Sequence, residues 1–492
     1  MSDLLRAGVH VKPCTVGLRT TIVASLGPAS RSVATLEAML REGMALARLN
    51  LAYETRELHA ETLANLRAAL VNTRGVCGVL VSLAGHAVRT VPGPAAASAV
   101  LLAQGQIFTW LTLASTAAPS DAPGPSCARL DCPEDFATLV SVGDSLVVDD
   151  GLLRFTVLEK LPGRLLCSVA VGGPLPVAVA KRVVVAKADG SPVRIPSAER
   201  LARERDIADA KWAVEQGADF LDGDLDSATF QAIVGDSGVR VLQRISSDDV
   251  VADALQSDGR EPLVAGTLLL RRQLGTMRPI SGVPSEQRAL AEHALVINRP
   301  LFIAAELLES MVRNPRPTRA EVSDAINAII EGAHGLVLTA ESAVGRNPVA
   351  VVRQLRQLCV EAESVIDYRA EYIEHRRRVL VPLEDKNLSL ASTAALCARD
   401  IGCERLLMIE PSPELSRAVS QFRGCSVAHF CTDARTAKQA MLLHGRVTVL
   451  DSECTKKTTQ QCIELLVEIG FLKPGQSIVV LTNDTMEVFH AN

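Results

Sequence analysis

The segment VLQRISSDD, residues 241–249, places charged and hydroxyl side chains directly after a run of apolar residues. Such a run is typical of a buried β-strand, and polar residues at the end of a buried strand commonly carry the chemistry of an α/β enzyme. Arg244 supplies a permanent positive charge. Ser246 supplies a short neutral oxygen. The segment is therefore a candidate active site at the end of a predicted strand.

A group of carboxylates forms a second candidate site. Asp222 and Asp224 are two residues apart, so a regular strand places both on one face. Together with Glu341 they could build a new metal site. The alternative, which we favour, is that the aspartates form buried salt bridges with Arg48 or Arg244. No histidine joins the group, and its spacing matches no familiar metal motif.

The elements that must position these residues follow a regular alternation of strand and helix. Short β-branched runs are each paired with a stretch of helical period, and the strand runs are TTIVASLG, ALARLNL, VCGVLVSLA, ADFLDGDL, VRVLQRI, PLVAGTL, PLFIAAE and GLVLTAE. An eightfold alternation of this kind predicts a parallel (β/α)8 TIM barrel. The fold class is therefore α/β, with the candidate residues at the carboxyl ends of the barrel strands.

Two further regions interrupt or follow this pattern. Residues 91–188 are rich in Pro, Gly and Val, and VVDDGLLRFTVLE is typical of a hairpin. This region is predicted to be a small β-barrel domain, inserted between the first part of the TIM barrel (1–90) and the second (189–378). Residues 379–492 again alternate helix and strand, which predicts a C-terminal three-layer α/β domain. The last residues before this domain, RQLCVEAESVIDYRAEYIEHRRR, are predicted to form one long helix.

Composition excludes several classes of function. The chain has 492 residues and a net charge of −5, with no run of Lys and Arg interleaved with aromatic residues, so a nucleic-acid partner is not expected. The N-terminus has no signal-peptide pattern, and the cysteines are expected to be reduced thiols of a cytoplasmic protein. AAASAVLLAQGQIFTWLTLASTAA lacks charge, but Gln and Gly interrupt it. We expect two short buried strands there, and no membrane span.

Several motifs resemble the pyruvate kinase family along most of the chain. TIVASLGPASRSVATLEAMLREGMALARLN is similar to the family's opening strand, its Gly-Pro turn and its second strand. VVDDGLL resembles a hairpin of the family's inserted domain, and LLESMVRNPRPTRAEVSDAINAIIEGAHGLVLTAES resembles its most specific signature. The resemblance implies a three-domain fold. It also implies phosphoryl transfer from phosphoenolpyruvate to ADP, with Mg²⁺ and usually K⁺.

The residues that the resemblance assigns to catalysis are altered here. Arg244 stands where the family has a lysine that stabilises the transferred phosphoryl group, and Ser246 stands where it has a glutamate that binds Mg²⁺. Leu268 replaces the second Mg²⁺ ligand, an aspartate. Ala305 replaces a threonine that contributes to proton delivery. These four positions are degenerate, so no catalytic residue and no metal site are expected.

Other positions implied by the resemblance are partly kept. Arg48, Asn50 and Arg89 match family residues that bind substrate or K⁺, and they are the candidate substrate-binding residues. Ala52, Ser82 and Leu83 stand where three other K⁺ ligands would be. Neither Mg²⁺ nor K⁺ is therefore expected as a cofactor.

In the C-terminal domain, many family members hold a sugar phosphate on a loop that matches MIEPSPELSRAV. Here Glu410 and Glu414 make that mode of binding doubtful, although Ser412 and Ser416 could still donate hydrogen bonds.

These observations predict a pyruvate kinase-like pseudoenzyme that acts as a non-catalytic regulatory or scaffold subunit. The NPRPTRAE segment matches the family signature closely, which suggests assembly into a homo-oligomer, or a hetero-oligomer with an active pyruvate kinase. A capping box at Thr318 and Glu321 is the structural explanation of the same segment. Three alternatives stay open: residual pyruvate kinase activity, a sensor that binds a phosphorylated small molecule through Arg48 and Arg89, and a new enzyme on the same barrel.

Overall fold

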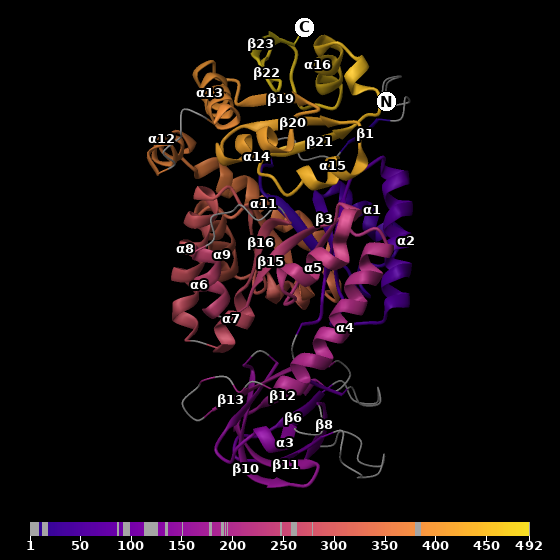
Figure 1. Ribbon diagram of the computed structural model, residues 1–492, viewed down its shortest axis with the longest axis vertical. Helices are drawn as coiled ribbons and strands as arrows, with labels where there is room; N and C mark the ends of the chain where they lie inside the picture. Colours follow the sequence, from indigo (N-terminus) through magenta and orange to yellow (C-terminus); the bar gives the residue numbers. More distant parts are fainter. Residues whose placement is uncertain are drawn as a thin grey trace.

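The chain forms three bodies along one axis, with the larger barrel in the middle (Figure 1). The computed structural model describes residues 9–11, 18–85, 88–91, 99–112, 126–132, 136–149, 151–176, 180–187, 191, 193, 195–246, 248–256, 263–277, 279–378 and 385–491. The predicted domain junctions after residues 188 and 378 lie next to or within segments outside these described residues.

The central body is a closed barrel of eight parallel strands. Its strands follow the order β14-β15-β16-β17-β18-β2-β3-β4. Their bounds are β2 (Thr21–Ser25), β3 (Met44–Asn50), β4 (Gly78–Ser82), β14 (Phe220–Gly223), β15 (Arg240–Ile245), β16 (Val264–Leu270), β17 (Leu301–Ala304) and β18 (Gly335–Leu338). Each overlaps one of the eight predicted runs, although β3 begins one residue before its run and β16 ends two residues after its run. The predicted TIM barrel is thus confirmed.

Helices pack around this barrel and bury their apolar faces against the strands. They are α1 (Val33–Arg41), α2 (Arg56–Thr73), α4 (Pro196–Glu215), α5 (Ser227–Val234), α6 (Asp248–Gln256), α7 (Arg271–Met277), α8 (Val283–Val296), α9 (Arg319–Ile330), α10 (Ala340–Ala343) and α11 (Pro348–Val365). Three short 3₁₀ turns accompany them: η2 (Gly235–Ser237), η3 (Ile280–Gly282) and η4 (Glu309–Val312). The predicted capping box at the start of α9 is present.

The inserted body is a second closed barrel, mostly antiparallel, in the order β10-β11-β7-β8-β5-β13-β9. Its elements are β5 (Val88–Thr90), β7 (Ile107–Leu111), β8 (Cys127–Asp131), α3 (Phe136–Leu139), β9 (Ser145–Val148), β10 (Leu153–Leu161), β11 (Arg164–Val171) and β13 (Arg182–Ala186). The predicted hairpin joins β9 to β10, with Asp149 and Gly151 at positive φ. Asp150 lies outside the described residues. Phe108, Trp110 and Phe155 pack together in the core.

One prediction about the uncharged stretch is wrong. It forms two strands around a turn, but the first of them places only Leu102 fully in the buried core, whereas the second, β7, belongs to that core. β6 (Ala99–Leu102) instead pairs with β12 (Gly173–Pro176) in a separate ribbon, and Leu101 is 78% exposed. A two-stranded ribbon has one face without cover, so apolar residues there stay at the surface. Residues 95–98 and 113–118 of the stretch lie outside the described part of the chain.

The C-terminal body is a six-stranded sheet between helices, in the order β1-β21-β20-β19-β22-β23. Its elements are β19 (Arg405–Ile409), β20 (Ser426–Cys431), β21 (Arg446–Leu450), β22 (Ser477–Leu481), β23 (Met486–His490), α13 (Lys386–Asp400), α14 (Pro413–Gln421), α15 (Ala434–Ala440), η5 (Cys454–Lys456) and α16 (Thr459–Glu468). The edge strand β1 (His10–Val11) comes from the other end of the chain and pairs antiparallel with β21.

The predicted long helix before this domain is in fact two helices, α11 and α12 (Tyr368–Arg378). Ile366 has extended backbone angles, which end α11. The carboxylate of Asp367 accepts hydrogen bonds from the backbone N–H groups of Arg369 and Ala370, both at 3.0 Å. An aspartate that caps free N–H groups starts a new helix, and the apolar period alone does not reveal this break.

Among the described helices, none combines the length and the apolar character that crossing a bilayer would require.

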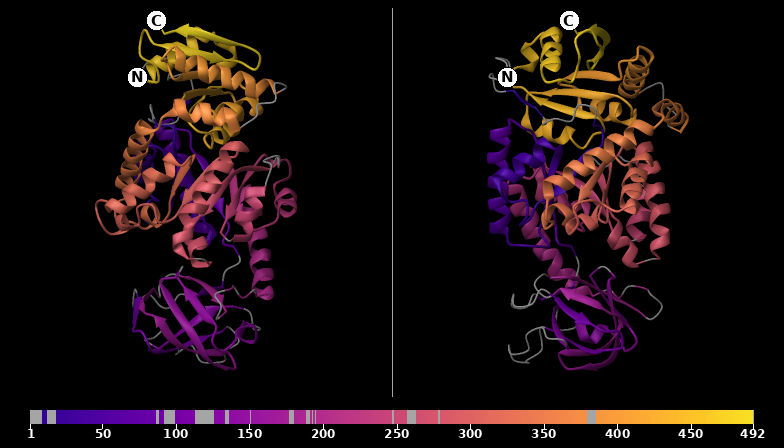
Figure 2. Two further views of the ribbon diagram at one scale, coloured as in Figure 1. Left: turned by 90° about the vertical axis from the view of Figure 1, so that its left-hand side faces the viewer. Right: turned by 180° about the vertical axis from the view of Figure 1, so that it is seen from behind.

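The C-terminal domain contacts the amino ends of the barrel strands, while the inserted barrel lies at the opposite, carboxyl end (Figure 2). The hydroxyl of Thr21 donates to the carbonyl of Met441 at 2.9 Å. Lys438 forms an ion pair with Asp219 at 3.3 Å. These contacts leave the carboxyl ends of the strands, where family members carry their chemistry, on the side of the inserted barrel.

The close packing of the barrel gives a direct test of the fold. A Cβ atom added at Gly335 on β18 would lie 2.4 Å from the ring of Phe302 and 2.8 Å from the carbonyl of Thr21. We expect Gly335→Ala to destabilise the protein by about 1–3 kcal/mol, because the strands cannot separate without opening the barrel. Gly275→Ala is the matched control, since its Cβ would meet nothing closer than 3.7 Å. Equal thermal unfolding of the two variants would contradict this account.

Candidate functional site

The strand ends of β14 and β15 bring Asp222 and Arg244 together in a buried ion pair. The two strands are neighbours in parallel register. The Nη2 and Nε atoms of Arg244 lie 2.6 Å and 2.8 Å from Oδ1 of Asp222. Nη2 also donates to the carbonyl of Leu83 at 2.7 Å. Asp222 is fully buried and Arg244 is 6% exposed, so water does not screen this pair.

A second carboxylate approaches the same guanidinium. Oδ2 of Asp224 lies 3.6 Å from Nη1 of Arg244. Burial alone would lower the pKa of Arg244, but the charges of Asp222 and Asp224 outweigh it and raise the pKa above its ordinary value. The structure therefore brings both aspartates to Arg244, as the salt-bridge interpretation predicts. The positive charge at this position is already balanced by groups of the chain itself.

Arg48 is tied to the same network through serines. Its Nε donates to the hydroxyl of Ser82 at 2.7 Å, and its Nη1 donates to the hydroxyl of Ser25 at 3.1 Å. The hydroxyl of Ser82 in turn donates to Oδ2 of Asp222. Burial lowers the pKa of Arg48. The network thus runs from Arg48 through Ser82 and Asp222 to Arg244, and it engages both carboxylate oxygens of Asp222.

The end of β17 is held by arginines that the sequence interpretation missed. Arg271, at the start of α7, donates to the carbonyls of Ala305 and Glu306, both at 2.9 Å. Ala305 and Glu306 have positive φ angles of 72° and 56°. Arg272 pairs with Glu306 at 3.3 Å and with Glu309 at 3.1 Å. The only sequence signal was the arginine pair that directly follows the apolar run LLL.

The remaining candidate residues lie apart from the ion pair. Oδ1 of Asn50 accepts the backbone N–H of Ala52 at 3.1 Å and so shapes a turn after β3. Arg89, on β5, donates to the carbonyl of Ala84 at 3.3 Å and lies over the ring of Tyr53. Glu341 is fully buried and accepts the N–H groups of Thr339 at 2.7 Å and Leu308 at 3.1 Å. Glu341 therefore holds backbone in place and does not face the aspartates as a third ligand.

Comparison with known proteins identifies the origin of this barrel. A family model described as "Pyruvate kinase, barrel domain" matches residues 18–352. The chain belongs to the pyruvate kinase family. A cytosolic pyruvate kinase isozyme of Glycine max is 26% identical, with 94% of this chain and 93% of the relative covered. Pyruvate kinase PKLR of Homo sapiens is 27% identical, with 94% of this chain and 82% of the relative covered. Pyruvate kinase 2 of Trypanosoma brucei brucei is also 27% identical, with 96% and 92% covered.

The residues at the two metal-ligand positions of this pyruvate kinase-like chain do not fit Mg²⁺. Leu268 is fully buried in the apolar cluster inside the barrel, with Leu242 and Phe302. Ser246 is partly exposed just beyond β15, and its neighbour Ser247 lies outside the described residues. Within the described part of the chain, no three His, Cys, Asp or Glu side chains gather as a metal site would require. Mg²⁺ prefers carboxylate and phosphate oxygens, which these two positions do not offer.

The ion pair can be tested by a double-mutant cycle. We expect Asp222→Leu and Arg244→Met each to destabilise the protein by about 3–5 kcal/mol, because each removes the closest buried partner of the other charge. The loss in the double variant should be smaller than the sum of the two single losses, although Arg48 still loses the carboxylate that it reaches through Ser82. As a control, Arg203→Ala breaks an exposed pair with Asp226 at 2.7 Å and should cost less than about 1 kcal/mol. Strictly additive losses in urea unfolding would show that the two residues are not coupled.

Proposed function

We propose that this member of the pyruvate kinase family does not transfer phosphate from phosphoenolpyruvate to ADP. The observation that carries the proposal is the buried pair of Arg244 with Asp222, at the position where the family places its phosphoryl-stabilising lysine. An arginine whose charge is balanced internally contributes little to an incoming phosphoryl group. Its planar head group is also fixed by the carbonyl of Leu83 and cannot follow a moving phosphate.

The altered metal positions support the same proposal. Phosphoryl transfer depends on fixed cations that bridge the phosphates, and their loss removes several kcal/mol of transition-state stabilisation. Leu268 and Ser246 provide no carboxylate, and Ala305 has no hydroxyl. Four altered positions at the carboxyl ends of the barrel strands are harder to compensate than a single one. We therefore propose no role for Mg²⁺ or K⁺ in this protein.

We further propose that the chain acts in the cytoplasm as a regulatory or scaffold subunit. The NPRPTRAE segment supports this role because it is well kept and mostly exposed. Arg313, Arg316 and Arg319 on or beside it are exposed, and their guanidinium groups make no ion pair with the described residues. Exposed arginines are common at the centres of protein interfaces. The partner is a second copy of the chain or an active pyruvate kinase.

The alternatives are less well supported by the geometry. If the protein is a sensor, its phosphorylated ligand would have to compete with the hydroxyls of Ser25 and Ser82 for the guanidinium of Arg48. Arg89 could still contact such a ligand. A metal ion bound to Asp222 in a new enzyme would have to displace Arg244 from one carboxylate oxygen and the hydroxyl of Ser82 from the other.

The loss of phosphotransfer predicts the behaviour of the protein in a pyruvate kinase assay. We expect a turnover below a thousandth of that of ordinary kinases, about 1–100 s⁻¹, with Mg²⁺, Mn²⁺ and K⁺ present. Arg244→Lys alone should change nothing, because the metal ligands are still absent. Ser246→Glu combined with Leu268→Asp should introduce divalent-cation binding, measured by calorimetry. Tight Mg²⁺ binding by the wild-type protein at the barrel mouth would overturn the proposal.

The subunit role predicts a defined assembly. Size-exclusion chromatography with light scattering should show a dimer or larger, alone or mixed with an active pyruvate kinase. Arg316→Glu should weaken the assembly, because it reverses a charge on the exposed segment. Arg377→Glu, on the exposed face of α12, is the matched control. A strict monomer that neither binds the active enzyme nor changes its kinetics would exclude this role.

A further inference from the structure

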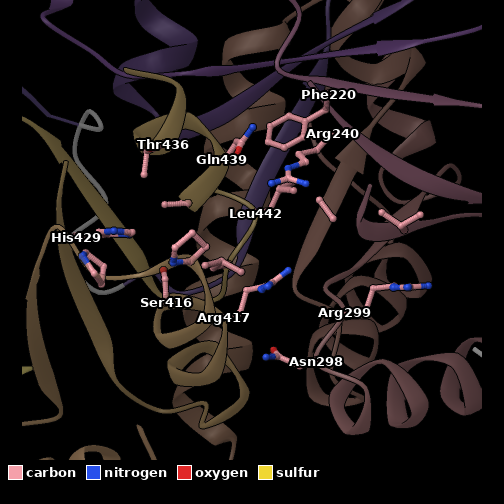
Figure 3. Close-up of a pocket in the computed structure, with 16 residues that line it drawn as sticks. Phe220, Arg240, Asn298, Arg299, Ser416, Arg417, His429, Thr436, Gln439 and Leu442 are labelled. Atoms are coloured by element: carbon pink, nitrogen blue, oxygen red, sulfur yellow. The ribbon is translucent and has the colours of Figure 1, made fainter. Parts of the chain in front are cut away.

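The C-terminal domain meets the barrel around the start of β2, and this region is called the domain contact below. The N–H of Gly445, in the loop before β21, donates across it to the carbonyl of Arg19 at 2.8 Å. Nearby, a cavity of about 150 Å³ remains between the two domains. Phe220 of the barrel lines it on one side, and Leu442 and His429 of the C-terminal domain line it on the other (Figure 3). Separation of the domains would therefore bring water to buried polar groups.

Two histidines meet in the domain contact, one from each domain. His334 directly precedes β18 of the barrel, and His444 lies two residues before β21 of the C-terminal domain. Their ring centroids are 6.1 Å apart and the ring planes are nearly perpendicular, at 82°. His334 is 4% exposed and His444 is 2% exposed. The contact between the domains is thus what keeps both rings out of water.

The hydrogen bonds around the two rings suit their neutral forms. Nδ1 of His334 accepts the N–H of Leu301 at 3.4 Å, and a protonated nitrogen cannot accept. Both ring nitrogens of His444 are buried and make no hydrogen bond to the described residues. The carbonyl of Gly332 favours a charged His334, but burial outweighs it. A second proton on either ring would therefore lose a hydrogen bond or remain without an acceptor.

Positive charges around the rings oppose protonation further. The cations that act on them are Arg19 at the start of the barrel, Arg423 in the loop before β20 and Arg446 on β21. Burial and then the charge of Arg423 lower the pKa of His334 to about 3. Burial, followed by Arg423, His334, Arg19 and Arg446, lowers the pKa of His444 well below its ordinary value. Like charges this close to a buried ring make its charged form unfavourable.

The carboxylates near the domain contact are already engaged by other groups. Glu371 pairs with Arg423 at 3.3 Å, and Glu404 pairs with Arg19 at 3.1 Å. Glu363 accepts the backbone N–H of Arg19 at 2.9 Å. Within the described part of the chain, none of these carboxylates is left to balance an added proton on either ring.

The other titratable groups at the domain contact are neutral as well. The ring of Tyr368 lies against the guanidinium of Arg19, and burial raises the pKa of its hydroxyl. Burial raises the pKa of the Cys425 thiol to about 12. Burial and then the charge of Arg446 lower the pKa of His429 to about 3. His429 therefore adds to the response of the two central histidines when water enters, and the other two groups do not.

We propose that His334 and His444 act as an acid-sensitive latch between the barrel and the C-terminal domain. With the domains in contact, both rings stay neutral. Once the domains separate, water surrounds each ring, and it takes up a proton at the ordinary histidine pKa of about 6.5. Proton uptake by the separated form alone shifts the equilibrium toward that form. The stability of the contact is therefore fully present above about pH 6.5 and is lost as the pH falls below it.

The test is hydrogen exchange of the full chain, with each rate divided by that of an unstructured peptide at the same pH. The N–H of Gly445 reports separation, because it donates across the domain contact. Its protection should fall at least about a hundredfold from pH 7.5 to pH 5.5, about tenfold for each histidine. His334→Asn, which keeps an acceptor for Leu301, and His444→Gln should each reduce that fall by about tenfold. His490→Gln, on the exposed edge strand β23, is the matched control and should behave like the wild type.

Three results would overturn the proposal. The first is protection of Gly445 that does not change between pH 7.5 and pH 5.5. The second is an equal fall in the wild type and in the double variant of His334→Asn and His444→Gln. The third is an equal fall at the amides of β16 inside the barrel, which would mean that the whole chain unfolds. A variant that is merely less stable loses protection by the same factor at every pH, so its pH dependence stays informative.

Discussion

A buried arginine needs an anionic partner, and this need governs the barrel mouth. Arg244 lies at the end of β15 with almost no access to water, and a guanidinium does not lose its proton in a protein. Removing such a charge from water costs several kcal/mol unless carboxylates and hydrogen bonds replace the water. Asp222 supplies the closest carboxylate, and Ser82 holds the other side of that carboxylate in place. The buried charge of Arg244 is therefore balanced by groups of the chain itself.

The charge balance explains why the substitutions belong together. Two metal-binding carboxylates beside Asp222 and Asp224 would repel one another strongly without a cation. Here those positions are an aliphatic side chain and a hydroxyl, and both Asp222 and Asp224 approach the guanidinium of Arg244. Leu268 also packs with the apolar interior of the barrel. The altered residues thus form a consistent electrostatic arrangement, which a chain that was merely losing its site residue by residue would not need.

Much of the fold is predictable because strand and helix periods differ and because a parallel barrel has apolar strands on both faces. The eight barrel strands follow from that pattern alone. The pairing of β1 with β21 does not, since a two-residue strand carries no period. The sequence does not reveal the break between α11 and α12, because the capping residue Asp367 interrupts the amphipathic pattern at only one position. The exposure of β6 depends on which strand it pairs with, and that is a property of the whole inserted domain.

The candidate site around Asp222 and Arg244 was predictable to a similar extent. The sequence places Asp222 and Arg244 at strand ends, and the rule that strand ends share one rim brings them close. It does not decide between Arg48 and Arg244 as the partner, because that choice depends on strand register. In the structure, Arg244 reaches the carboxylate directly, whereas Arg48 reaches it only through the hydroxyl of Ser82. A serine between two charged groups lets one carboxylate serve both arginines. The end of the barrel can therefore hold two buried arginines on the shared carboxylate of Asp222.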